Sequence, residues 1–160
     1  MLNELINRLP DGRAENELVR FMRALSEGEK ASIVEMILAH DFSSVRGSVL
    51  RIIPRVIRDR DVLIKFLDAG LEKKHPYGAR FWIKATVPGL GYKKLLNHLQ
   101  EIAEKEPEWI VHAWYYLVLL VRKEAPERMY ILEKIRNTVD ITLNSELRDF
   151  WQRNKDSVPI

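Results

Sequence analysis

The apolar residues of this chain recur at the spacing of an α-helix from one end to the other, and this pattern restricts the fold more than any other feature. Leu63, Phe66 and Ala69, for example, lie three residues apart and therefore share one face of a helix. No run of residues alternates between apolar and polar for long enough to predict a β-strand. The sequence therefore predicts an all-α protein.

Capping residues and prolines predict where the helices begin. Ser26 and Glu29 have the spacing of a capping box, in which each side chain satisfies a backbone N–H at a helix start. Asp11-Gly12 predicts a turn. Three prolines stand where a missing N–H costs nothing, in the first turn of a helix: Pro76, Pro107 and Pro126. The predicted helices span residues 2–9, 14–25, 28–40, 44–58, 61–74, 77–87, 92–105, 108–123, 127–139 and 145–154.

A weak internal repeat with a period of 33 residues runs through the middle and the end of the chain. Its apolar positions in one helix of each pair are Leu63, Phe66 and Ala69, then Leu96, Leu99 and Ile102, then Met129, Leu132 and Ile135. In the preceding helices the same step joins Val49, Trp82 and Tyr115, and also Ile52, Ala85 and Val118. The repeating unit is therefore a pair of helices.

Helical pairs of this size, with a proline inside or at the end of the first helix as at Pro54 and Pro88, resemble HEAT-like α-solenoid repeats. The resemblance covers roughly residues 43–139, rests on periodicity, and assigns no functional residue. It implies stacked helical hairpins, which most often form interaction surfaces; the HEAT-like alkylpurine DNA glycosylases bind nucleic acid along the inner face. We therefore expect one domain, residues 1–160, with about 8–10 helices. An irregular helical bundle is the alternative.

Composition excludes several classes of site. The chain has no cysteine, so disulfides, thiolate zinc sites, iron–sulfur clusters and a cysteine nucleophile are ruled out. The first eight residues mix charged and apolar side chains and lack the apolar core of a secretory signal, so we expect a cytoplasmic protein. The longest uncharged apolar stretch, residues 109–121, is 13 residues long, which is too short to cross a bilayer, and no membrane association is expected.

That same stretch predicts a helix that is apolar on every side. A helix of this kind is normally buried between its neighbours, and we expect this of Trp114 and the residues around it. The functional alternative is an aromatic binding groove built from Trp114, Tyr115 and Tyr116.

The charges are unevenly distributed along the chain. Formal net charge is +3, but residues 43–100 hold 12 basic and 4 acidic residues, whereas residues 1–42 hold 5 and 8. The 28 residues between Glu72 and Glu101 contain no acid at all. Arg51, Arg55 and Arg58 follow one another at helical spacing and so form a stripe on one helix face.

This segment predicts a positive surface that attracts an acidic protein or phosphates. Its expected members are the cations Arg51, Arg55, Arg58, Arg80, Lys84, Lys93 and Lys94, with Tyr77 and Trp82 as aromatic contacts. In the alternative reading these cations are ordinary surface residues, balanced by acidic first and last segments that fold back alongside. The turn Pro88–Lys94 contains glycines before two lysines, but it matches neither a Walker loop nor a dinucleotide fingerprint.

No catalytic constellation is present in the sequence. The four histidines, His40, His75, His98 and His112, form no helical metal pair, and no Gly-x-Ser-x-Gly elbow occurs. We therefore expect no enzyme, no catalytic residue, no metal and no cofactor.

The leading hypothesis is a non-enzymatic interaction module that binds an acidic protein through residues 43–100. A nucleic-acid-binding or DNA-repair module and a small bacterial immunity or antitoxin-type inhibitor are the alternatives. The sequence does not predict an oligomeric state.

Overall fold

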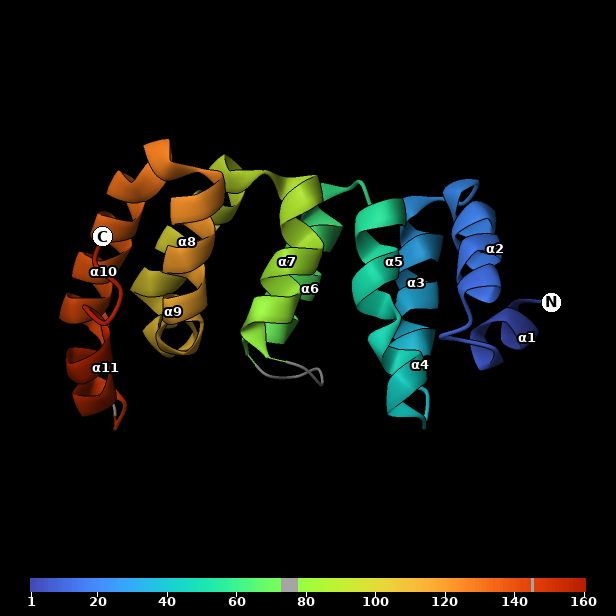
Figure 1. Ribbon diagram of the computed structural model, residues 1–160, viewed down its shortest axis with the longest axis horizontal. Helices are drawn as coiled ribbons and strands as arrows, with labels where there is room; N and C mark the ends of the chain where they lie inside the picture. Colours follow the sequence, from blue (N-terminus) through green and yellow to red (C-terminus); the bar gives the residue numbers. More distant parts are fainter. Residues whose placement is uncertain (73–77, 145) are drawn as a thin grey trace. The chain divides into compact units, whose positions relative to one another are not determined.

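The computed structural model describes residues 1–72, 78–144 and 146–160, and every regular element within these ranges is helical (Figure 1). The all-α prediction is confirmed. The helices are α1 (Leu2–Asn7), α2 (Gly12–Arg23), α3 (Glu27–Leu38), α4 (Ser43–Gly47), α5 (Val49–Val56), α6 (Arg60–Leu71), α7 (Ala79–Leu90), α8 (Tyr92–Lys105), α9 (Pro107–Glu124), the 3-10 turn η1 (Pro126–Arg128), α10 (Met129–Thr142) and α11 (Arg148–Asn154).

Local signals in the sequence place most helix ends. Asp11 caps α2 by accepting a hydrogen bond from the N–H of Ala14 at 2.9 Å. Both hydrogen bonds of the capping box between Ser26 and Glu29 are formed. Pro107 is the first residue of α9, and Pro126 opens η1, whereas Pro76 lies outside the described residues. Pro54 lies inside α5, as predicted, whereas α7 continues through Pro88 to Leu90 although the predicted helix ends at residue 87.

The helix predicted over residues 44–58 is divided in two at Ser48. The backbone of Ser48 keeps right-handed helical angles, with φ −61° and ψ −26°, so α4 and α5 follow each other closely. Gly47 and Ser48 are both weak helix formers, which accounts for the interruption at this point.

The chain forms two compact units, and each is described by itself. The first unit contains residues 1–69 and 81–89. In it α5 packs against α2 and α3, and these three helices lie side by side in Figure 1. Phe66 of α6 and Trp82 of α7 stack with ring centroids 6.4 Å apart. Its core includes Leu18, Met22, Val34, Ile37, Ile52, Ile53, Leu63 and Leu67, all fully or almost fully buried.

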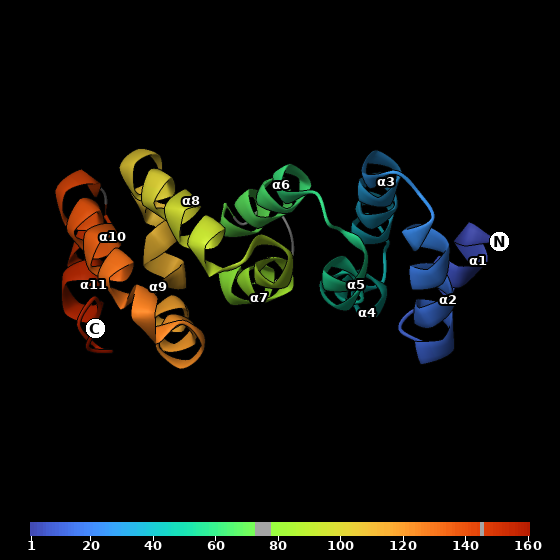
Figure 2. The same cartoon turned by 90° about the horizontal axis from the view of Figure 1, so that it is seen from above.

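The second unit contains residues 70–80 and 90–160. Here α8 packs against α9 and α10, and Figure 2 shows α8 and α10 side by side. Two polar links join this helix pair: Gln100 donates to the hydroxyl of Thr138, and Thr142 donates to the carbonyl of Ala103, both at 2.7 Å. Its core includes Leu95, Leu96, Leu99, Leu117, Val118, Val121, Leu132, Ile135 and Val139. Within the described ranges, no helix combines the length and apolarity needed to cross a membrane.

Candidate functional site

A groove with a volume of about 580 Å³ runs between α5 and α7 in the first unit. We call it the basic groove. Its lining residues come from two short stretches, and they are Gly47, Leu50, Arg51 and Pro54 on one side and Phe81, Lys84, Ala85 and Pro88 on the other. Most of these side chains are apolar, and the charged ones, Arg51 and Lys84, contribute one cation to each side.

Helical spacing explains why α7 presents this particular face. Phe81, Lys84, Ala85 and Pro88 are separated by three, one and three residues, so they form one stripe along the helix. The opposite stripe contains Trp82, which is fully buried in the core of the unit. The same helix therefore holds the fold together on one side and forms the groove on the other.

On α5, the groove side and the core side are divided in the same way. Leu50 and Pro54 are half-buried and line the groove, whereas Ile52 and Ile53 are fully buried. Arg51 extends from the edge of this face, and 53% of its side chain is exposed.

A buried carboxylate holds Arg51 in place. Nε and Nη2 of Arg51 donate to Oε2 of Glu15 at 3.0 and 2.9 Å, and Nη2 also lies 3.3 Å from the hydroxyl of Ser48. Arg55 contacts the other oxygen of Glu15 at 3.4 Å and donates to Asn16 at 2.9 Å. Glu15 is 10% exposed at its side chain, so its charge is directed at these two arginines. Glu15, from the acidic first segment, therefore pairs with both arginines and offsets one of their two charges.

The remaining predicted site residues are not gathered in the groove. Arg58 is exposed and donates from Nη1 to the carbonyl of Pro54 at 3.4 Å. Arg80, Lys93 and Lys94 are exposed but belong to the second unit. Tyr77 lies outside the described residues. Of the seven predicted cations, the structure brings Arg51 and Lys84 into one cavity.

The expectation that Trp82 contacts a partner is wrong, because its side chain is fully buried. Phe81, the residue before it, faces the groove and is 37% exposed. Trp82 falls at the same repeat position as Val49 and Tyr115. Val49 is also fully buried but Tyr115 is 60% exposed, so the repeat position alone does not identify a core residue.

The prediction that α9 is buried on every side is also wrong. Ile110, Trp114, Leu117 and Val121 pack inward, but Tyr115 is 60% exposed and Leu119 is 40% exposed. Exposed His112 shares their face, because residues three and four apart lie on one side of a helix. The helices that pack on α9 cover its other side, and His112 and Tyr115 of this face line a pocket beside α11.

The described part of the chain contains no cluster of side chains suited to a metal ion, and the pKa of two tyrosines is raised. No three histidine, aspartate or glutamate side chains gather there closely enough to hold a metal ion. Burial raises the pKa of Tyr92, and the charge of Glu124 adds to this effect. Burial also raises the pKa of Tyr116, while the nearby charge of Arg80 opposes it.

Comparison with known proteins finds no matching family model, no matching curated protein and no matching solved structure.

Proposed function

We propose that this chain is a non-catalytic protein-binding module whose basic groove holds an acidic, amphipathic helical segment of a partner protein. The observation that supports the proposal most directly is the composition of the groove, an apolar floor with Arg51 on one edge and Lys84 on the other. A helix with one apolar face and carboxylates beside that face matches both properties. The floor favours burial of its apolar face, and the edge cations select for negative charge.

The charge available to a partner is smaller than the sequence suggests. Glu15 offsets one of the two arginines that contact it, so Glu15, Arg51, Arg55 and Lys84 together carry a net charge of +2. A surface of this modest charge suits a short acidic segment better than a phosphate backbone, whose binding depends on many cations at once. The buried position of Trp82 also removes one of the two aromatic side chains expected to stack on bases.

A HEAT-like arrangement of the helices is part of the proposal. Helix pairs with a proline inside the first helix, at Pro54 in α5 and Pro88 in α7, support it. In such folds the helices of neighbouring pairs lie side by side and leave grooves between them.

The experiment is a fluorescence anisotropy titration with a labelled peptide of about 18 residues. The peptide has leucines at helical spacing and glutamates beside them, and a second peptide carries lysines in place of the glutamates. We expect the acidic peptide to bind and the basic one not to bind. Single-stranded and duplex DNA are titrated in parallel at about 50 and 200 mM salt, because affinity for a phosphate backbone falls steeply between these two concentrations.

Two groove variants and one matched control localise the binding. Lys84→Glu and Phe81→Ala are each expected to weaken the acidic peptide by about threefold to tenfold. Lys65→Glu makes the same change of charge on α6 in the same unit, at an exposed residue outside the groove, and is expected to leave affinity unchanged. Equal losses in Lys84→Glu and Lys65→Glu, or tight salt-sensitive DNA binding without peptide binding, contradict the proposal.

A further inference from the structure

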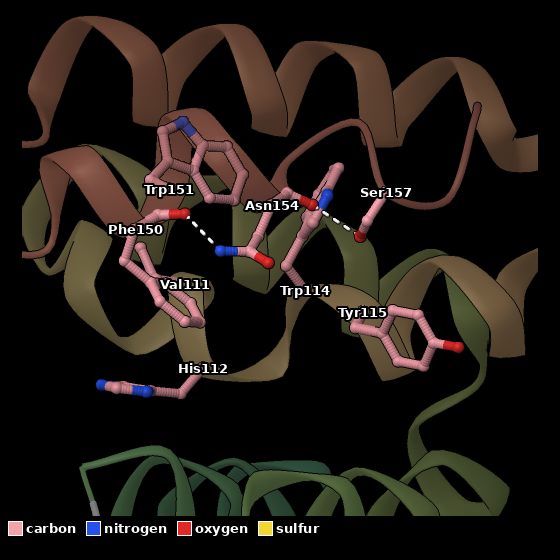
Figure 3. Close-up of a pocket in the computed structure, with 8 residues that line it drawn as sticks. All are labelled: Val111, His112, Trp114, Tyr115, Phe150, Trp151, Asn154 and Ser157. Carbon is pink, nitrogen blue, oxygen red and sulfur yellow. Dashed lines mark hydrogen bonds between the residues drawn. The ribbon is translucent and has the colours of Figure 1, made fainter.

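A second cavity lies in the other unit, between α9 and α11, and is independent of the basic groove. Its volume is about 220 Å³, and Figure 3 shows the residues that line it. Four aromatic side chains line it, Trp114 and Tyr115 from α9 and Phe150 and Trp151 from α11. We call it the aromatic pocket.

Two of the four rings are fixed in place. Trp114 is 3% exposed and donates from Nε1 to the carbonyl of Lys155 at 2.9 Å, and Trp151 is 1% exposed and donates from Nε1 to Asp140 at 2.8 Å. The two indoles meet edge to face, with centroids 5.3 Å apart and an interplanar angle of 70°. Because both N–H groups and the mutual packing hold these rings, the inner wall is organised before any ligand arrives.

The other two rings stand at the mouth of the pocket. Phe150 is 45% exposed and Tyr115 is 60% exposed, and Figure 3 places them on opposite sides of Trp114. Exposure of large aromatic side chains to water is unfavourable. An apolar ring bound between Phe150 and Tyr115 would remove part of their surface from water and would therefore be stabilised there. Stacked or edge-to-face contacts with aromatic walls add to that gain.

The charge of the lining restricts the ligand. None of the eight lining residues is a lysine, arginine, aspartate or glutamate. Asn154 donates from Nδ2 to the carbonyl of Phe150 at 2.7 Å, and Ser157 donates to the backbone carbonyl of Asn154 at 2.7 Å. These bonds leave the side-chain oxygen of Asn154 as an acceptor, and Figure 3 shows it turned toward the middle of the pocket. His112 is the one lining side chain that can carry a positive charge near neutral pH, and the lining holds no fixed charge, so a neutral ligand with a hydrogen-bond donor matches this pocket.

The volume of the aromatic pocket restricts the size of the ligand. A cavity of about 150 Å³ with apolar walls is enough to hold benzene. The aromatic pocket, at about 220 Å³, has room for one ring system with a small extension. We propose that the aromatic pocket binds a neutral aromatic ring that bears one N–H or O–H donor, of the indole or phenol type, with the donor directed at Asn154.

The test uses the full chain labelled with ¹⁵N and follows the indole N–H signals of its four tryptophans during titration with indole. Trp114 and Trp151 line the pocket, whereas Trp109 does not and Trp82 lies in the first unit. We expect saturating shifts of the first two signals and none of the Trp82 signal. Equal shifts of all four signals, or shifts that do not saturate, overturn the proposal.

A double comparison tests the role of Asn154. The second probe, 1-methylindole, keeps the ring but has no donor, and we expect it to bind about threefold to tenfold more weakly than indole. In Asn154→Leu the two probes are expected to bind equally, because the acceptor is gone. Equal binding of the two probes to the unchanged protein shows that no donor is recognised and refutes the donor part of the proposal.

A wall variant and a control variant complete the design. Phe150→Ala removes a half-exposed ring, so the fold is retained, and at least a threefold loss of indole binding is expected. Gln152→Ala changes an exposed residue of the same helix outside the pocket and is expected to have no effect. Far-UV circular dichroism confirms that each variant is folded.

N-acetyltryptophanamide, a model of a tryptophan side chain within a peptide, distinguishes the source of the ring. Tighter binding than indole indicates a side chain of a peptide, and weaker binding indicates a free small molecule.

Discussion

Two nitrogens of Arg51, Nε and Nη2, donate to the same carboxylate oxygen of Glu15, at 3.0 and 2.9 Å. The pair joins α5 to α2 across 36 residues of sequence. Arg51 thus has a structural role inside the first unit as well as a position on the edge of the basic groove.

Reversing the charge of Arg51 and Arg55 is therefore expected to destabilise the fold. In the double variant Arg51→Glu with Arg55→Glu, two new carboxylates would lie beside that of Glu15, and the three negative charges would repel one another. We expect the free energy of unfolding to fall by about 1–3 kcal/mol, measured by urea denaturation. Lys84→Glu, on the opposite edge of the groove, is the control and is expected to leave stability unchanged. A double variant as stable as the parent chain would show that the pairing with Glu15 contributes nothing.

Gly89 of α7 lies against the side chain of Leu63 in α6. A Cβ atom at this position would overlap Cδ1 of Leu63, a fully buried side chain that must shift to accommodate it. We expect Gly89→Ala to lower the free energy of unfolding by about 1–3 kcal/mol, the usual effect of overpacking. Gly28→Ala in α3 meets open space and is expected to be neutral or slightly stabilising, because alanine favours a helix. Thermal denaturation of both variants compares the two sites, and the prediction fails if they behave alike.

Glu27 links the start of α3 to the loop before α6. Burial alone would raise the pKa of Glu27, but hydrogen bonds from Lys30 and from the N–H groups of Asp59 and Arg58 outweigh it, so the pKa lies below its ordinary 4.5. A lowered pKa in the folded state means that this stabilisation is fully present above about pH 4.5 and is lost as the pH falls through the folded-state value.

Glu27→Gln removes that contribution. At neutral pH we expect a loss of about 1–2 kcal/mol, because the amide is a weaker acceptor for Lys30 and the two N–H groups. The difference between variant and parent is expected to shrink below pH 4.5. Urea denaturation at several pH values between about 3 and 7 measures it. A difference that stays constant with pH would show that the carboxylate charge is not responsible.

Trp114 anchors the end of the chain to α9. Its ring packs on Trp151, and its N–H holds the carbonyl of Lys155. We expect Trp114→Ala to cost about 3–5 kcal/mol of unfolding free energy, and Trp114→Phe to cost less because part of the ring packing is kept. Trp109→Ala, at a half-buried position on the same helix, is the comparison and should cost less than Trp114→Ala. A nearly neutral Trp114→Ala is the outcome that contradicts the assignment of Trp114 to the core.

Periodicity was sufficient to predict the helices and much of the core. The helix predicted over residues 92–105 is α8, Tyr92–Lys105, because a glycine precedes it and its apolar residues recur regularly. The 33-residue step relates Phe66, Leu99 and Leu132, and all three are buried in the core. It fails at Tyr115, which is 60% exposed at the position equivalent to the buried Val49. Sequence spacing identifies a helix face, but it does not show which faces a neighbouring helix covers.

The candidate sites were less predictable than the fold. The charge pattern singled out seven cations, of which Arg51 and Lys84 line one groove, but it could not show that Glu15, 36 residues before Arg51, lies against that arginine. The aromatic pocket depends on Phe150 and Asn154, which approach Tyr115 through the packing of α11 on α9. Contacts between residues so far apart in sequence depend on the tertiary fold and leave no local pattern.

The prolines of the basic groove also affect its hydration. Pro54 and Pro88 have no N–H, so the carbonyls four residues earlier, those of Leu50 and Lys84, lack their usual helical donors. Both of these residues line the groove. Water is the natural donor to such oxygens in the unoccupied protein, and an occupant that displaces this water without a replacement pays a desolvation penalty. A purely aliphatic helix is therefore a poorer occupant than one with serine, threonine or glutamine among its apolar residues, whose hydroxyl or amide groups can take the place of the displaced water.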